Sequence, residues 1–596
     1  MSLARVLGLL LGLLAILGYA DVGRYYGGFR VPQGYGMNFL LPEELAHIAL
    51  FSVLGLAAVV GLSAALAGTD LTAWCVQAVR GASRHGVAMS AVLGAFVLLS
   101  TFGFARYVLG HAAITDDEHV YRFIAQTLRH GSVTAPSPGV DLEFFREQFV
   151  VLTPFVRYGK YPLGHPLLLA AGQALGVEAF VVPLASALLV PALFWVGSAT
   201  FDRTTATVAT LLLASSPQLL ATGATLFSQP AAAACLIGAM GCLLRAMRGE
   251  RPSPPWLAGA GALLGYGVLV RPLPGVLFAL AALWWMAAAG GSRELRVRLR
   301  AAAVLAAPVV AAGTLLLLVN RAQTGGLLSS GYQAFHAPND VGVGVGTGVG
   351  GDLGLEVMSV VASLLRVSVW LTGWPGALLF LFLARGGRAR GLVWAMIAAE
   401  WLYRLVSPKA GVGGAGPLYL FEVLPLLCLL VAGGLVQLAR TRRPVGPWTA
   451  SPSLMAALVL AGAVVNLCMF LPVKALDLRR MAEAQLLPGR LIRERGLGHA
   501  LVFHNGVVPP SSGLSWAYFP PCNSPALDDD VLWVRVDRAD PGRNLAFWKQ
   551  RFPERSAWYY RLEGGKPLLQ DLESFLERPA SLVTSPPGPT ATAGRP

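Results

Sequence analysis

Long apolar segments alternate with short polar segments along most of the chain. A membrane-spanning helix needs about 20 predominantly apolar residues. Segments of this kind lie near residues 5–20, 45–67, 87–108, 178–200, 205–222, 228–244, 256–270, 272–289, 301–319, 357–384, 391–406, 417–438 and 453–472. The pattern therefore predicts an all-α polytopic membrane domain with about 12–13 transmembrane helices.

The pattern changes near residue 473, where the chain becomes charged and loses its long apolar runs. The segments HALVFHNGVV (499–508) and DVLWVRVD (530–537) are typical of strands, and NLAFWKQRF (544–552) is typical of a short helix. We therefore expect a small α/β domain over residues 473–584. The Pro-rich tail at 585–596 is predicted to be disordered.

Composition and charge agree with a membrane protein. Hydrophobic residues make up 55% of the chain and charged residues only 13%, and the mean hydropathy is +0.59. Soluble domains carry about 25% charge, which excludes a soluble globular protein. The net charge of +14 does not indicate a nucleic-acid partner, because the basic residues form short clusters between apolar segments. That arrangement is typical of a topology signal in a bilayer.

The arginine clusters predict the orientation of the chain. They fall in alternate loops, at residues 80–84, 203, 245–251, 293–300, 385–390 and 440–443. The positive-inside rule places these loops in the cytoplasm. The long segments 109–177, 320–356 and 473–596 then lie outside the cytoplasmic membrane. The first apolar segment, within residues 1–20, fits either a spanning helix or a cleaved signal peptide, and both place Asp21 outside.

The stretch ITDDEHVYRF, residues 114–123, has the features of a helix start. Thr115 is followed three residues later by Glu118, which is the spacing of a capping box. Asp116, Asp117 and Glu118 would occupy the first turn, where carboxylates meet the positive end of the helix dipole. This role alone would explain the acids.

The helical period separates the two central acids. At 100° per residue, Asp117 shares an apolar stripe with Tyr121 and Ile124, facing the membrane domain. Glu118 lies on the opposite side with Arg122, its potential partner at i+4. A carboxylate on a stripe that faces the interior is costly without a purpose. We therefore predict a functional role for Asp117, whereas the structural role at the helix start suits Glu118.

Three other polar patterns are weaker indications of a functional site. The glycine-rich segment 341–351 follows no strand and is interpreted as a flexible loop, not a dinucleotide site. The DxD pattern at 528–530 precedes a predicted strand and fits a surface turn. The four histidines near Asp117 match no ligand spacing, so a metal is left open; they are His111, His119, His130 and His165.

Six short motifs occur in a recognisable order. They are DDEHVY, GKYPLGHPLLLAAGQALG, ASSPQLLATGATLFSQPAA, GYGVLVRPLPG, VNRAQTGGLLSSGYQ and GPLYLFEVLPLL. Between residues 87 and 440 the chain resembles the GT-C glycosyltransferases, specifically bacterial relatives of glycosyltransferase family 39 and the dolichyl-phosphate-mannose protein mannosyltransferases. The resemblance implies a GT-C-like catalytic domain over residues 87–472, preceded by extra spans over residues 1–86.

The resemblance also implies an activity. Members of this family transfer a sugar from a polyprenyl-phosphate carrier to an acceptor hydroxyl on the outer face of the membrane. The expected partners are therefore the lipid-linked donor, the bilayer and a glycan, lipid or protein acceptor. Asp117 matches the family's acid in the first outer loop, with Glu118 beside it. A general base of this kind takes the proton from the attacking hydroxyl. No cofactor is certain, and a divalent metal stays open.

The departing phosphate needs cations. By resemblance, Lys160 and Tyr161 in GKYPLGHP match a family segment near the phosphate. Arg271 in VRP lies at a membrane edge, where an ordinary interfacial Arg that extends toward water is an equal alternative. Five further residues are weaker site candidates: His165, Gln229, Arg404, Lys409 and Glu422.

Two departures and one competing function qualify this assignment. Close relatives often carry His in place of Gln229 and Arg in place of Leu418. Glu422 is an intramembrane acid, a functional candidate by default, with Arg404 or Lys409 as its possible structural partners. A transporter or lipid-linked glycan flippase would also have many spans, but it should show inverted repeats and midplane charges. Here the charges gather in one loop, which favours the enzyme.

Overall fold

A computed structural model gives the fold. It describes residues 3–25, 42–289, 294–335, 353–406, 416–442, 444–445, 448–506, 518, 520–563 and 566–576. Within these ranges eight helices are long and apolar enough to cross a membrane, and three shorter apolar helices accompany them. The chain is therefore a multi-pass membrane protein, and the predicted all-α membrane domain with a small C-terminal α/β unit is confirmed.

The membrane domain is built from helices in the predicted order, except that the helix at Asp70–Arg84 was not predicted. They are α1 (Leu3–Tyr25), α2 (Pro42–Leu66), α3 (Asp70–Arg84), α4 (Gly86–Tyr107), α7 (Glu178–Thr200), α8 (Arg203–Ala214), α9 (Pro217–Thr222), α10 (Gln229–Ala246), α11 (Pro254–Val270), α12 (Pro272–Ala289), α13 (Leu295–Thr324), α15 (Leu353–Trp370), η2 (Ala377–Leu383), α16 (Ala389–Val406), η4 (Leu418–Val423), α17 (Leu424–Thr441) and α18 (Pro452–Val465). Two short strands, β4 (Pro444–Val445) and β5 (Trp448–Thr449), pair after α17.

Two predicted spans are interrupted. The span at 205–222 divides into α8 and α9, because Pro217 disfavours helical backbone at Ser216, which is extended (φ −64°, ψ 122°). The span at 357–384 ends as α15 at Trp370, and the chain then turns through Gly373 and Gly376. Both glycines have positive φ, a region that residues with a side chain rarely adopt.

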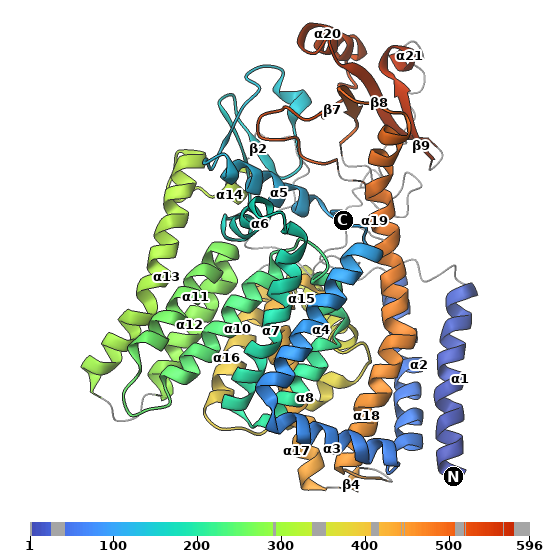
Figure 1. The fold of residues 1–596 in the computed structure, drawn as a ribbon, viewed down its shortest axis with the longest axis vertical. Helices are drawn as coiled ribbons and strands as arrows, with labels where there is room; N and C mark the ends of the chain where they lie inside the picture. Colours follow the sequence, from blue (N-terminus) through green and yellow to red (C-terminus); the bar gives the residue numbers. More distant parts are fainter. Residues whose placement is uncertain are drawn as a thin grey trace, which may run out of the picture.

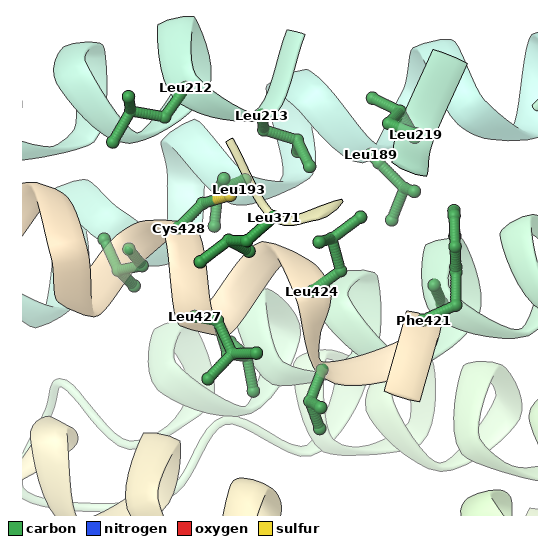
Figure 2. Close-up of a cluster of buried hydrophobic side chains, with 14 of the residues drawn as sticks. Leu189, Leu193, Leu212, Leu213, Leu219, Leu371, Phe421, Leu424, Leu427 and Cys428 are labelled. Atoms are coloured by element: carbon green, nitrogen blue, oxygen red, sulfur yellow. The ribbon is translucent and has the colours of Figure 1, made fainter. Parts of the chain in front are cut away.

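The centre of the membrane domain is packed around α17. Leu424, Leu427 and Cys428 of this helix are buried among leucines of α7, α8 and α9 (Figure 2). Phe421, in the preceding η4, belongs to the same cluster and is fully buried. This packing fixes the start of η4 and α17 relative to α7, and so fixes the polar residues beside Phe421.

The long loop at 109–177 forms a small folded unit. It contains α5 (Asp116–Arg129), β1 (Ala135–Pro136), η1 (Leu142–Phe145), β2 (Val150–Leu152), β3 (Val156–Gly159) and α6 (Gly164–Ala174). The three strands form an antiparallel sheet in the order β1-β3-β2. This sheet was not predicted, because its strands are only two to four residues long.

The loop elements gather at one end of the membrane helices. Figure 1 shows α5, α6, α14 (Gly331–Phe335) and the C-terminal sheet at that end, whereas α3 and β4 lie at the opposite end. The arginine-bearing α3, with Arg80 and Arg84, is therefore separated from the long loops by the helical bundle. This separation agrees with the arrangement predicted from the arginine clusters.

The last membrane helix continues far beyond its predicted end. The span predicted at 453–472 is α18, which runs through a π-helical turn at Asn466–Phe470 into α19 (Leu471–Glu494). The helix rises without a break from the bundle to the C-terminal sheet (Figure 1). Lys474 and Asp477, which form an ion pair at 3.6 Å, are buried near the start of α19.

The C-terminal unit is a four-stranded sheet with two helices. Its strands are β6 (Ala500–His504), β7 (Val531–Arg535), β8 (Ser556–Glu563) and β9 (Lys566–Asp571), in the order β7-β6-β8-β9. The predicted strands at 499–508 and 530–537 and the predicted helix, α20 (Pro541–Arg551), are confirmed. β8, β9 and α21 (Leu572–Leu576) were not predicted. The predicted tail at 585–596 and the glycine-rich segment 341–351 lie outside the described residues.

The long loop and the C-terminal unit share one hydrophobic core. Phe144 and Phe145 of η1 are buried among residues of β6, β7 and α20, and the Phe144 ring stacks on Phe547 with centroids 4.0 Å apart. Arg157 of β3 is fully buried, pairs with Glu147 at 3.4 Å and donates to two backbone carbonyls of the C-terminal unit. Neither part completes its core without the other.

We expect Phe144→Ala to release the C-terminal unit from the loop. Truncation of a buried Phe costs about 3–5 kcal/mol, because it removes apolar contacts and leaves a cavity. The measurement is limited proteolysis of the purified full chain, followed at sites within residues 497–563. Phe155→Ala is the matched control, since Phe155 lies in the same loop but is 84% exposed. Equal protection of the two variants would contradict a shared core.

Candidate active site

Asp117 lies in the first turn of α5 and contacts Tyr161. The helix begins at Asp116 with Thr115 as its N-cap residue, as predicted, although the Thr115 hydroxyl makes no capping bond to the helix. The Tyr161 hydroxyl donates a hydrogen bond to the Asp117 carboxylate. The Tyr121 ring, on the same stripe of α5, lies 4.8 Å from the Tyr161 ring. The structure therefore brings the predicted acid and the predicted loop tyrosine together.

Lys160 lies beside Tyr161 in an aromatic enclosure. Its Nζ lies 3.0 Å from the ring centroid of Phe149, and within 5.0–5.7 Å of the rings of Tyr161, Phe335 and Tyr332. The side chain is buried, so this cation is held largely by aromatic faces and nearby carboxylates. Burial and the neighbouring Asp117 raise the pKa of Asp116, and the charge of Lys160 opposes that shift.

Arg271 occupies the break between α11 and α12. The residue is extended (φ −141°, ψ 96°), because Pro272 follows it and begins α12. Its Nε lies 2.7 Å from Glu422 Oε1, and its guanidinium lies 5.6 Å from the Tyr419 ring centroid. The side chain is only 15% exposed, so the alternative of an Arg that extends into water is wrong. Glu422 therefore pairs with Arg271. The side chains of Arg404 and Lys409, the partners considered from the sequence, lie outside the part of the chain that the structure describes.

Two tyrosines connect the Asp117 side of the site to the Arg271 side. The charges of Asp117 and Arg271 both act on Tyr121 and on Tyr332 of α14. Burial, together with the negative charge of Asp117, raises the pKa of Tyr121, and its hydroxyl lies 3.2 Å from Ser228 Oγ. Asp117 and Arg271 therefore belong to one polar, tyrosine-lined site.

Glu118 faces away from this site and is fully buried. Its two carboxylate oxygens accept hydrogen bonds from the backbone N–H groups of Ile114 and Leu226, each at 2.9 Å. Burial raises the pKa of Glu118 to about 7, although both hydrogen bonds oppose this shift. The predicted i+4 partner Arg122 instead pairs with Glu178 at 3.3 Å. Glu118 therefore ties the start of α5 to the segment before α10.

The weaker candidates lie around the same segment. His165 of α6 is buried, its Nε2 lies 2.7 Å from the Leu226 carbonyl oxygen, and burial lowers its pKa to about 4. Its ring is 5.0 Å from Tyr121, so His165 adjoins the site as a neutral group at neutral pH. Gln229 is buried at the first position of α10. Arg404 belongs to α16, and Lys409 lies outside the described residues.

Four site residues were not predicted from the sequence: Tyr121, Ser228, Tyr332 and Tyr419. Each of them lies within one of the short motifs that carry the family resemblance. Tyr121 shares the helical stripe of Asp117, so the 3.6-residue period could have identified it. Ser228, Tyr332 and Tyr419 reach the site only through tertiary packing. Among the residues that the structure describes, no group of three or more His, Cys, Asp or Glu side chains could hold a metal ion.

The fold and this site define the class of protein: a polytopic membrane protein with an acid, two cations and four tyrosines gathered at one end of its helices. Residues 160–316 match the family described as dolichyl-phosphate-mannose-protein mannosyltransferase, which confirms the predicted resemblance to GT-C membrane glycosyltransferases. The match covers about a quarter of the chain; Lys160 and Arg271 lie within it, and Asp117 precedes it.

Solved structures show more distant similarity. ArnT from Cupriavidus metallidurans bound to undecaprenyl phosphate is 13% identical, covers 82% of this chain and 94% of its own, and gives a TM-score of 0.49. The Archaeoglobus fulgidus oligosaccharyltransferase tethered with an acceptor peptide is 16% identical. It covers 65% of this chain and 55% of its own, and gives a TM-score of 0.42. Both TM-scores are below 0.5, so these similarities carry no functional argument. No curated protein matches the sequence significantly.

We expect Glu118→Gln to reduce the pH dependence of stability. Because the pKa of Glu118 in the folded chain exceeds its ordinary value of 4.5, the stabilising proton is fully effective below about pH 4.5 and is lost as the pH rises through 7. A shift of this size corresponds to about 3 kcal/mol. The midpoint of thermal unfolding should therefore fall between pH 4.5 and 7 in the parent chain, and fall much less in Glu118→Gln.

The quantity to compare is the change of the unfolding midpoint with pH, and not the midpoint itself. Gln offers only one acceptor oxygen to the two N–H groups, so it lowers stability at every pH. Glu178→Gln serves as the control, since Glu178 lies nearby, is partly exposed and carries an ion pair. If the unfolding midpoint of Glu118→Gln falls with pH as much as that of the parent chain, Glu118 is already ionised across this range.

Proposed function

We propose that this chain transfers a sugar from a polyprenyl-phosphate carrier to an acceptor hydroxyl on the outer face of the cytoplasmic membrane. The observation that supports this function best is the hydrogen bond between Tyr161 and Asp117, in a site that also holds Lys160 and Arg271. The match to a family of mannosyltransferases supports a lipid-phosphate donor. None of the matches reported above is to a transporter, and no observation favours a transporter or flippase.

In this proposal Asp117 is the general base. The Tyr161 hydroxyl donates a hydrogen bond to a carboxylate oxygen of Asp117 and so orients this carboxylate, which would take the proton of an incoming hydroxyl. As the acceptor oxygen attacks the anomeric carbon, the bond from that carbon to the phosphate oxygen breaks. The polyprenyl phosphate departs with the additional negative charge, and Asp117 retains the proton.

The departing phosphate would bind Lys160 and Arg271. Lys160 is enclosed by aromatic rings, and Arg271 is compensated by Glu422, so both cations can be buried before the donor arrives. The ion pair at 2.7 Å uses the Arg271 Nε, and a guanidinium has four further N–H donors. A phosphate is a suitable partner for these donors.

The proposed location is the inner membrane of the cell, with residues 109–177, 320–356 and 473–596 outside. Membrane proteins carry their Arg clusters on the cytoplasmic side, and here α3, with Arg80 and Arg84, lies at the opposite end of the bundle from α5 and the C-terminal sheet. The C-terminal unit shares a core with the proposed catalytic loop, which supports the proposal that both lie on the same side.

We expect Asp117→Asn to lower turnover of the lipid-linked donor by a factor of about 10²–10⁴, the usual contribution of a general base. Asn retains the size of Asp and can accept the Tyr161 hydrogen bond, but it cannot take a proton at neutral pH. The measurement is single-turnover transfer by the purified full chain. The donor is identified by mass spectrometry of lipid-linked sugars that accumulate in a deletion strain.

Glu118→Gln is the matched control, because it changes the neighbouring carboxylate in the same way. We expect it to lower turnover far less than Asp117→Asn does, because Glu118 faces away from Tyr161 and Gln keeps one acceptor oxygen for the partners of Glu118, which are two backbone N–H groups and the Thr115 hydroxyl. Lys160→Ala should instead raise the donor KM. An active Asp117→Asn with an inactive Glu118→Gln would show that Glu118 is the base. Activity in both Asp117→Asn and Glu118→Gln would show that the general base is not one of these two residues of α5.

We expect a cysteine introduced at Ala539 to react with a membrane-impermeant maleimide in intact cells. Ala539 is exposed and precedes α20 in the C-terminal unit. A cysteine introduced at Arg84 of α3, at the other end of the bundle, should react only after permeabilisation. Reversal of the two results would overturn the orientation and the proposed outer-face reaction.

A further inference from the structure

A second cavity lies against the opposite face of α5 from Asp117. It has a volume of about 560 Å³, and its walls come from the end of α4, α5, the end of α6, the start of α7 and the segment 224–226. Glu118, Arg122 and Arg129 of α5 line it, at helical spacing. Asp117 and Tyr121 are not among its lining residues. One helix therefore separates two polar sites.

The acids of the second cavity are already engaged. Glu118 accepts two backbone N–H groups, and Glu178 accepts Arg122 Nε at 3.3 Å and Gln173 Nε2 at 3.0 Å. Arg122 contacts Glu178 through Nε, and its side chain remains one-third exposed, so its terminal nitrogens can reach a ligand. Arg129 is exposed at the same wall. The two arginines of the cavity can therefore donate hydrogen bonds to an anion.

His111 lies in the wall of the same cavity, close to two arginine charges. Its backbone is in the left-handed region (φ 56°), which is uncommon for a residue with a side chain, and it follows Gly110, also at positive φ. This turn places the imidazole in the cavity wall. Partial burial, followed by the charges of Arg106 and Arg122, lowers the pKa of His111. Two positive charges, those of Arg106 and Arg122, therefore act on this position.

The cavity is located at the edge of the membrane. It lies where the span α4 ends and the span α7 begins. Large apolar side chains beside it are exposed: Tyr107 by 82%, Leu175 by 76% and Phe180 by 42%. Leu184 and Leu188 continue this exposed apolar surface along α7. A ligand with a charged end and an apolar tail would match both surfaces.

We propose that this second cavity binds the anionic phosphate headgroup of a membrane lipid, with the lipid chains along the exposed face of α7. Arg122 and Arg129 would contact the headgroup, and the site is separate from the one proposed for the sugar donor. The inference rests on the cavity and its charges and does not require transferase activity. A free phosphate offers the same oxygen atoms, so the experiment compares the two sources.

The test is native mass spectrometry of the purified full chain titrated with phosphatidylglycerol or with phosphatidylcholine. We expect saturable binding with a preference for phosphatidylglycerol, and a loss of affinity of about 10-fold or more in Arg129→Glu, which replaces one charge-assisted contact by repulsion. Arg479→Glu is the control, because Arg479 of α19 is exposed and lies outside the cavity. It should bind as the parent chain does.

Arg129→Glu is preferred to a change at Arg122, since Arg129 is exposed and its replacement leaves the Arg122–Glu178 pair intact. Equal losses in Arg129→Glu and Arg479→Glu, or equal binding of the two lipids, would overturn the proposal. Displacement of the lipid by millimolar inorganic phosphate, with the same affinity for phosphate and lipid, would show a free-anion site and overturn the lipid assignment.

Discussion

The arrangement of both sites depends on one buried carboxylate. Glu118 accepts the N–H groups of Ile114 and Leu226, which are 112 residues apart in the chain and belong to different parts of the fold. A buried carboxylate is costly unless its oxygens are bonded, and here both are. This bond fixes the rotation of α5 about its axis. The rotation in turn decides that Asp117 meets Tyr161 and that Arg122 and Arg129 meet the second cavity.

Charge compensation determines where the cations can lie. A buried guanidinium without a partner would cost several kcal/mol. Arg271 is held against Glu422, which Phe421 anchors through the core around α17 (Figure 2). Lys160 is held by aromatic faces and by the nearby carboxylate of Asp116. The site is therefore preorganised by residues that come from α5, from the segment directly after β3, from the break between α11 and α12, and from η4.

Much of the fold follows from local patterns in the sequence. The span at 178–200 matches α7 residue for residue, and the start of α5 at Asp116 follows from the acids and from Thr115. These features depend on apolar length and on a helix terminus, both of which are local. The break between α8 and α9 was missed, although Pro217 marks it. Apolar composition continues across that proline and conceals the interruption.

The candidate site could be predicted only in part. Asp117, Lys160 and Arg271 follow from motif order and from the cost of burying charge, and their catalytic and binding roles stay predictions. The Arg271–Glu422 pair and the Arg122–Glu178 pair could not be predicted, because each joins residues far apart in sequence. Arg122 had a nearer acid at Glu118, and tertiary packing, not helical spacing, decided which of the two acids it contacts.

The shared core of η1 and the C-terminal sheet limits how this protein can change during evolution. Phe144 and Phe547 stack on each other across a boundary between two segments that are about 400 residues apart. A change of size on one side leaves a void or a clash unless the other side changes with it. The loop and the C-terminal unit should therefore be inherited and exchanged as a pair. A chimaera that replaces only one of them would join surfaces that never adapted to each other, next to the helix that carries Asp117.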